Sequence, residues 1–305
     1  MKKVLLVLAA ILMNLSVSAK GIKVVSDLPV SVPDGEASYS PLMSPAGDYI
    51  LLTSGSMEGL KKYDLSTGVL TTVTSDKGAG YNAKISEDGK IIVYRESVFK
   101  DRLRYTSVKC INLEDCETET VVRNSRYVAA FEIEKGTALA LEKGKIKSKR
   151  MNGRKVKEPV MVSVQNGRLT VTRDEVTRVL SPCGDKHYLW QSLSPDREKI
   201  LFAVPEKKGA VAYICDLYGG SLVRLGVMSA PVWMGNDWVV GMNDEDNGEF
   251  FTASVIVAVR VTGEDYTILT DNSKISMYPS ASADASKIVY NTADGKIFML
   301  NVVTE

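Results

Sequence analysis

The sequence predicts an all-β protein built as a β-propeller, and three observations lead to this prediction. Short runs rich in Val, Ile, Thr and Tyr alternate with Gly, Asp, Asn and Ser, and helical periodicity is absent after the first residues. One unit of strand, turn and strand recurs along the chain. The copies lie about one propeller blade apart, roughly 40 to 50 residues.

The recurring unit is clearest in the stretch YSPLMSPAGDYILLTS, from Tyr39 to Ser54. Ser44 to Gly47 form its turn, because proline presets φ at the second turn position and glycine accepts a left-handed one. The aliphatic strand Tyr49 to Leu52 follows. Three further stretches keep this pattern and two keep it weakly: 81–96, 188–204 and 278–290, then 127–141 and 230–241.

The spacing of the copies sets the number of blades. The turn positions are separated by 42, 47, 61, 40 and 48 residues. The long interval contains two hairpin signals, Asn152-Gly153 and Asn166-Gly167. That region is therefore one elaborated blade or one blade plus a degenerate seventh. We expect six blades, with seven as the alternative. The equivalent turn positions are Gly47, Gly89, Gly136, Arg197, Asp237 and Ala285.

A strand at the start of the chain is predicted to close the ring. Residues Gly21 to Val32 form a strand outside the repeat frame, and the last copy supplies only three strands before Glu305. Pairing the first strand with the last blade would complete four strands and leave the ring closed. A second landmark is a short polar side chain at the end of an apolar strand, able to hydrogen-bond the next turn. It recurs at Asp64, Asn112, Asp216 and Asn301.

The first residues read as a targeting segment. Lys2 and Lys3 precede an apolar run, and small residues around Ala19 offer a cleavage site, so 1–19 is predicted to be a signal peptide and 20–305 the propeller. The run is too short for a transmembrane helix, and no later window is apolar enough for one. We expect a monomer, exported to the periplasm or secreted. The balance of 38 basic and 37 acidic residues argues against a nucleic-acid binder.

Four cysteines fit an exported protein in which disulfides form, and they allow three pairings. Buried thiols acting as small apolar groups are the alternative. The four are Cys110, Cys116, Cys183 and Cys215.

Groups for catalysis or metal binding are sparse. His187 is the only histidine, which excludes His-pair metal motifs, and no G-x-S-x-G or Walker loop is present. We therefore expect His187 to be a structural or rim residue and the protein to need no cofactor. The acidic run containing Asp244, Asp246 and Glu249 offers oxygen ligands to Ca²⁺, although its spacing does not match an EF-hand loop. A solvated hairpin tip is the favoured interpretation.

A row of lysines flanks the Asn152-Gly153 signal. Alternation along a strand places several of them on one face, where they would meet an anionic glycan or an acidic protein surface. We favour the alternative, an edge strand kept soluble by charge. The lysines are Lys143, Lys145, Lys147, Lys149, Lys155 and Lys157.

Aromatic residues gather where the innermost strands are expected to begin. In a radial ring these positions approach one mouth of the central channel, and Tyr and Trp are favoured interface anchors. We therefore predict partner binding there, with packing between blades as the alternative. The residues are Tyr39, Tyr81, Tyr127, Tyr188, Trp190, Trp233 and Tyr278.

The repeat resembles that of a known family. The segments SPAGDYILL, SEDGKIIVY, SPDREKILF and SADASKIVY are similar to the S-P-D-G-x-x-I-x-[FY] repeat of TolB-like, WD-repeat-like β-propellers. The resemblance covers nearly all of 20–305 and implies a ring closed by an N-terminal strand. Two departures concern the turns: Arg197 and Ala285 replace the glycine and should distort them. A third is that TolB proteins carry an α/β domain ahead of the propeller, whereas we expect only about Lys20 to Glu36 ahead of the first blade here.

The resemblance and the lack of catalytic groups lead to one expected function. We expect an exported, noncatalytic propeller that acts as a binding or scaffolding module of the cell envelope, with a protein or glycan partner. The alternative is a carbohydrate-active enzyme, a lyase or hydrolase, with a carboxylate or metal site in the channel. Related lyases of oligogalacturonides use several histidines around a metal, which one histidine cannot reproduce.

Overall fold

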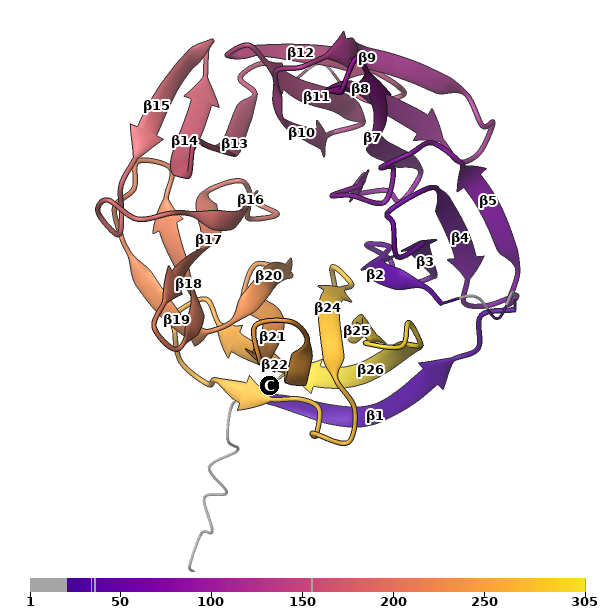
Figure 1. Cartoon of the computed structure of the whole chain (residues 1–305), viewed down its shortest axis with the longest axis vertical. Helices are drawn as coiled ribbons and strands as arrows, with labels where there is room; N and C mark the ends of the chain where they lie inside the picture. Colours follow the sequence, from indigo (N-terminus) through magenta and orange to yellow (C-terminus); the bar gives the residue numbers. More distant parts are fainter. Residues whose placement is uncertain (1–20, 34, 36, 155, 305) are drawn as a thin grey trace, which may run out of the picture.

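A computed structural model describes residues 21–33, 35, 37–154 and 156–304, so the predicted signal peptide lies outside the described residues. The described chain forms 26 strands and no helix. The strands make seven antiparallel sheets arranged in a ring, whose centre we call the channel (Figure 1). The all-β propeller is confirmed with the alternative count of seven blades, and the expected six is wrong.

We number the blades along the chain and give the strands from the channel outward. Blades 1 and 2 have four strands each: β2 (Tyr39–Met43), β3 (Tyr49–Thr53), β4 (Leu60–Asp64) and β5 (Leu70–Thr74), then β6 (Lys84–Ile85), β7 (Ile91–Lys100), β8 (Leu103–Asn112) and β9 (Thr118–Ser125). Blades 3 and 4 have three each: β10 (Val128–Glu134), β11 (Thr137–Glu142) and β12 (Lys145–Arg150), then β13 (Val160–Gln165), β14 (Arg168–Arg173) and β15 (Val176–Leu180).

The last three blades return to four strands. Blade 5 contains β16 (Leu189–Leu193), β17 (Lys199–Glu206), β18 (Gly209–Asp216) and β19 (Val223–Val227). Blade 6 contains β20 (Ser229–Met234), β21 (Trp238–Asp246), β22 (Phe251–Arg260) and β23 (Thr267–Ile268). Blade 7 contains β24 (Ser276–Ala281), β25 (Lys287–Thr292), β26 (Ile297–Thr304) and, from the start of the chain, β1 (Ile22–Val30).

The long interval in the repeat accounts for the extra blade. It holds two short sheets where one elaborated blade was expected. Asn166-Gly167 is a hairpin turn as predicted, with Gln165 opposite Arg168 and φ values of 52° and 76° at the turn. Asn152-Gly153 is not, because β12 is an edge strand and the chain leaves blade 3 after it.

The predicted closure of the ring is confirmed. β1 runs antiparallel to β26, from Ile22 opposite Thr304 to Val30 opposite Ile297. Asp27 of β1 lies 2.7 Å from Lys274 Nζ and accepts a 2.7 Å hydrogen bond from the Tyr290 hydroxyl. In Figure 1 the indigo β1 accordingly lies beside the yellow β26.

The polar residues of the repeat stabilise turns, as predicted for the ends of the third strands. Asp64 Oδ1 accepts hydrogen bonds from the backbone of Ser66 and Thr67, and Asp216 Oδ1 accepts from Tyr218 and Gly220. At the closing blade no such turn follows. Asn301 instead donates a 2.8 Å hydrogen bond to Ser26 of β1.

The core lies between neighbouring sheets. The β3 strand is buried at all five positions, and similar buried strands recur in the other blades. Tyr188 and Phe202 pack edge to face at 5.3 Å in the core between blades 4 and 5. Within the part of the chain that the structure describes, no helix has the length and apolarity needed to cross a membrane.

Candidate functional site

Most of the innermost strands have a local irregularity where they begin. The pairing register shifts between the first residues of β2, β16, β20 and β24 and their partner strands. One residue in each shift, and one just ahead of β6, has a positive φ: Ser40, Asn82, Trp190, Ala230 and Tyr278. These are β-bulges, which bend a strand and re-aim its side chains.

Two of the bulge positions carry bulky aromatic residues. Trp190 and Tyr278 have φ values of 50° and 51°, a region that residues with large side chains rarely adopt. Holding a non-glycine residue there costs on the order of 1 to 2 kcal/mol. Such strain is concentrated at functional sites in proteins, and this mouth of the channel is therefore a candidate site.

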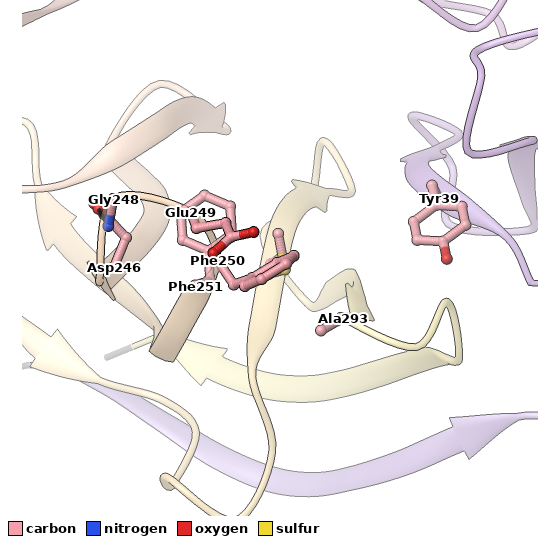
Figure 2. Close-up of a pocket in the computed structure, with 8 residues that line it drawn as sticks. Tyr39, Asp246, Gly248, Glu249, Phe250, Phe251 and Ala293 are labelled. Atoms are coloured by element: carbon pink, nitrogen blue, oxygen red, sulfur yellow. Dashed lines mark hydrogen bonds between the residues drawn. The ribbon is translucent and has the colours of Figure 1, made fainter.

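A cleft of about 440 Å³ opens on this face. It lies between the β21–β22 hairpin of blade 6, the β25–β26 turn of blade 7 and the start of β2 in blade 1. Figure 2 shows Tyr39 on one side, with the group formed by Glu249, Phe250 and Phe251 across from it. The lining residues are Tyr39, Asp246, Gly248, Glu249, Phe250, Phe251, Met277 and Ala293. We call this the mouth cleft.

Tyr39 is held in place by two glycines. A Cβ on Gly55 would come within 3.2 Å of its ring, and one on Gly295 within 3.0 Å. The bulge beside it is fixed as well, because the Ser40 backbone donates a 3.1 Å hydrogen bond to the buried Asn291 side chain. The ring is therefore positioned by close packing against backbone.

The acidic hairpin tip forms the opposite wall. Asp246 Oδ1 accepts a 2.8 Å hydrogen bond from Gly248 N, and Asn247 Oδ1 accepts from Glu249 N and Phe250 N. These bonds order the tip and leave Phe250 66% exposed. Among the described residues no group of three or more His, Cys, Asp or Glu side chains is placed to hold a metal ion, and a Ca²⁺ site at Asp244, Asp246 and Glu249 stays a prediction from the sequence.

The same hairpin influences the neighbouring inner strand. Burial raises the pKa of Tyr278, and the negative charge of Asp244 raises it further. Asp244 therefore lies close enough to the start of β24 to affect it electrostatically. The acidic run and the aromatic residues, predicted as separate features, belong to one region.

The other predicted aromatic residues are distributed around the ring. Tyr81 is 52% exposed beneath the Arg95 guanidinium, 3.8 Å from its ring centre. Tyr127 is 59% exposed, and Lys143 Nζ lies 5.5 Å from its ring centre. Trp190 is 41% exposed. These three rings face solvent but do not line the mouth cleft.

Two of the predicted residues are packing residues in this structure. Tyr188 is fully buried, and its hydroxyl donates to Gly184 O and accepts from Cys183 N. Trp233 packs against the core between blades 5 and 6. Tyr188 thus presents no surface to a partner, as the packing alternative anticipated.

The remaining candidates lie elsewhere. His187 is exposed against Gly167, in the tight turn of blade 4. β12, which carries Lys145, Lys147 and Lys149, is the edge strand of blade 3, and Lys149 pairs with Glu119 at 2.9 Å. All four cysteines are free thiols.

Sequence reasoning missed the apolar part of the cleft. Phe250 and Phe251 follow the acidic run directly, and Met277 precedes the predicted Tyr278. The available signal was the pair of aromatic residues at a predicted hairpin tip, where polar residues are usual.

Comparison with protein-family models and with curated proteins finds no match. Solved structures do match. The TolB of Acinetobacter baumannii superposes with a TM-score of 0.55 at 16% identity, over 80% of this chain and 57% of that one. A putative TolB from Agrobacterium tumefaciens gives 0.56 at 15% identity, over 88% and 91%. An oligogalacturonate lyase from Vibrio parahaemolyticus gives 0.51 at 11% identity, over 89% and 80%. The likeness is one of fold. This chain spans little more than half of the A. baumannii protein.

Proposed function

We propose that this protein is an exported, noncatalytic binding module of the cell envelope and that its partner binds at the mouth cleft. Export rests on the predicted signal peptide at 1–19 and noncatalytic binding on the scarcity of catalytic groups. The resemblance of the repeat to TolB-like propellers, and the fold shared with TolB structures, support a propeller module in that setting.

The residues that line the cleft indicate which kind of partner would bind there. Its polar side chains are the carboxylates of Asp246 and Glu249 and the hydroxyl of Tyr39, and its apolar walls come from Phe250, Phe251 and Met277. None of these lining residues is a cation. Carboxylates beside aromatic rings favour a Lys or Arg side chain, through charge pairing and cation–π contact. We therefore favour a basic segment of an envelope protein.

The same chemistry disfavours an anionic ligand. Oligogalacturonates carry a carboxylate on every sugar, and these would face Asp246 and Glu249 across the cleft. A neutral glycan remains the second candidate, because sugar rings stack on aromatic side chains and their hydroxyls hydrogen-bond carboxylates. Lyase or hydrolase activity in the channel remains the alternative from another class.

The test is calorimetry with a synthetic peptide of alternating Lys and apolar residues, a neutral oligosaccharide and oligogalacturonate. The peptide should bind, with an affinity that falls as salt rises. Phe250→Ala and Glu249→Gln should each weaken binding about five-fold or more, because the loss of an interface anchor costs about 1 kcal/mol or more. Phe99→Ala, which removes an exposed ring on the β7–β8 hairpin, is the matched control.

The other outcomes decide against the proposal. Binding of the neutral sugar alone would reassign the cleft to glycans. Breakdown of either carbohydrate by the purified protein, lost in the Glu249→Gln variant, would make it an enzyme.

A further inference from the structure

Blade 4, like blade 3, has only three strands. Its sheet ends at its third strand, β15 (Val176–Leu180), so the place occupied by a fourth strand in five of the blades is open. The first four residues of β15 are exposed, with Val176 at 56% and Val179 at 61%. Figure 1 shows β15 on the outside of the ring with no strand beyond it.

The register identifies which backbone groups are free. Asp174 and Glu175 form a two-residue turn, with φ values of 51° and 59°, and Arg173 lies opposite Val176. In such a hairpin the residues flanking the turn exchange hydrogen bonds, and the pattern then alternates. The N–H and C=O groups of Val176 and Arg178 therefore point to β14. Those of Thr177 and Val179 point away from it, toward solvent.

The edge lacks the devices that usually block pairing. Edge strands are protected by lysines, proline, bulges or short length. β12 carries three lysines, β1 has a bulge and Pro29, and β23 has two residues. β15 has no lysine or proline, and its register with β14 is continuous.

A groove runs along this edge on one face of the sheet. It has a volume of about 470 Å³ and lies between β15 and the outer loop of blade 5, which contributes Leu217 and the 71% exposed Tyr218. Arg173 and Arg178 line it together with Asp174, so its charge is positive on balance.

We propose that β15 binds an extended segment of a partner protein, which adds to blade 4 as a fourth strand and carries an acidic residue between two apolar ones. The outward-pointing groups of Thr177 and Val179 supply the backbone hydrogen bonds. The acidic side chain pairs with Arg178, and the apolar side chains two residues to either side enter the groove beside Val176 and Leu180. Strand addition of this kind takes affinity from the main chain and specificity from alternate side chains.

A second copy of this chain is a poorer occupant. Two β15 strands that used both outward-pointing residues would pair Thr177 of one copy with Val179 of the other. Arg178 would then lie directly opposite Arg178, in the position where cross-strand side chains are closest. Like charges in that position destabilise a sheet.

The test uses two synthetic peptides of alternating Val and Thr, identical except for Glu or Lys at the centre. Amide hydrogen exchange followed by NMR reports the contact directly. With the Glu-centred peptide, the amides of Thr177 and Val179 should become protected, while that of Arg178, already bonded to β14, should not change. A peptide N-methylated on the pairing edge should give no protection.

Three variants separate this edge from the mouth cleft. Val179→Pro removes an outward N–H and should abolish binding. The fold should accept this substitution, because proline is tolerated where the N–H faces solvent. Arg178→Glu should lower affinity for the Glu-centred peptide about ten-fold and favour the Lys-centred one. Phe250→Ala should have no effect. Absence of binding by either peptide, or binding that survives Val179→Pro, would overturn the proposal. So would a concentration-dependent dimer that Val179→Pro abolishes.

Discussion

Arg197 Nε lies 3.0 Å from Glu134 Oε2, an ion pair that joins a turn of blade 5 to the end of β10 in blade 3. The Arg197 Nη2 atom also donates a 2.6 Å hydrogen bond to Val160 O, at the start of blade 4. The Arg197 side chain thus extends from blade 5 and contacts both blade 4 and blade 3. Arg197 occupies the position where the repeat has glycine, and its φ of 64° is the glycine conformation. The expected distortion of this turn is absent, and the arginine instead links three blades.

Restoring the glycine should therefore destabilise the protein. Arg197→Gly relieves the positive φ but removes the nearer of the two cations beside Glu134, whose side chain is 8% exposed, and leaves only Lys135 Nζ at 3.8 Å. Breaking a buried pair costs about 3 to 5 kcal/mol, more than the roughly 1 to 2 kcal/mol of strain that is removed. Urea unfolding should show a net loss of about 2 kcal/mol.

Ala285→Gly is the matched control for that measurement. Ala285 also replaces the turn glycine and has a φ of 58°, but it has no side chain that could form such a pair. This variant should gain about 1 kcal/mol. If both substitutions stabilise the protein, the link between Arg197 and Glu134 contributes nothing.

Asp27→Asn should loosen the closure of the ring. Asp27 forms an ion pair with Lys274 and accepts a hydrogen bond from the Tyr290 hydroxyl. The side chains of Asp27 and Lys274 are each 23% exposed. We expect a loss of about 1 to 2 kcal/mol in thermal unfolding and faster hydrogen exchange in β1. Asp294→Asn breaks a pair of equal length with Lys296, but an exposed one, and should cost under about 1 kcal/mol. Equal losses of stability in the two variants would show that the contacts of Asp27 stabilise the protein no more than an exposed ion pair does.

Much of this fold could be predicted from the sequence, because each copy of the repeat carries the residues that form its own turn. Ser44, Ser194 and Ser282 each bond their own turn, and proline, aspartate or glycine beside them marks where a strand ends. The unfinished last blade predicts the pairing of β1 with β26. Blades 3 and 4 could not be told from one elaborated blade in the sequence, because their first hairpins turn at Lys135-Gly136 and Asn166-Gly167, which lack the serine of the repeat.

The candidate site was less predictable because it forms only in the tertiary structure. Tyr39 and Phe250 are far apart in the sequence, and nothing local says that the first inner strand and the sixth blade's hairpin share a cleft. Tyr188 and Tyr39 carry the same signal in sequence, at the start of an inner strand. Only packing distinguishes the buried ring from the one that lines the cleft.

Stability should fall steeply in acid. Hydrogen bonds from Ser66 and Thr67 lower the pKa of Asp64 from 3.8 to about 2, and bonds from backbone N–H groups lower the pKa of Asp216. A carboxyl whose pKa is depressed on folding stabilises the protein above its unfolded pKa and loses that contribution as pH falls through the folded one. The melting temperature should therefore drop between about pH 4 and about pH 2.

The contribution of a single turn can be isolated in the same experiment. Asp216→Asn keeps an acceptor for the N–H groups of Tyr218 and Gly220 but does not titrate. Its melting temperature should depend less on pH than that of the unmodified protein. Glu175→Gln, at the exposed turn of blade 4, removes a carboxylate that lies away from these turns and serves as the control. A pH dependence unchanged in Asp216→Asn would mean that the turn carboxylates do not drive acid unfolding.

The strain at the channel mouth predicts that removing Trp190 costs less stability than its buried surface implies. Trp190→Gly gives up the contacts of an indole that is 41% exposed, but it relieves a positive φ worth about 1 to 2 kcal/mol, which offsets part of that loss. Urea unfolding should show a smaller loss for Trp190→Gly than for Leu189→Gly. Leu189→Gly, at the preceding residue, relieves no positive φ and should cost about 1 kcal/mol. If Trp190→Gly is as destabilising as Leu189→Gly, the indole contributes more packing energy than the bulge costs. Its placement would then be explained by the fold alone, and the bulges would not mark a binding face.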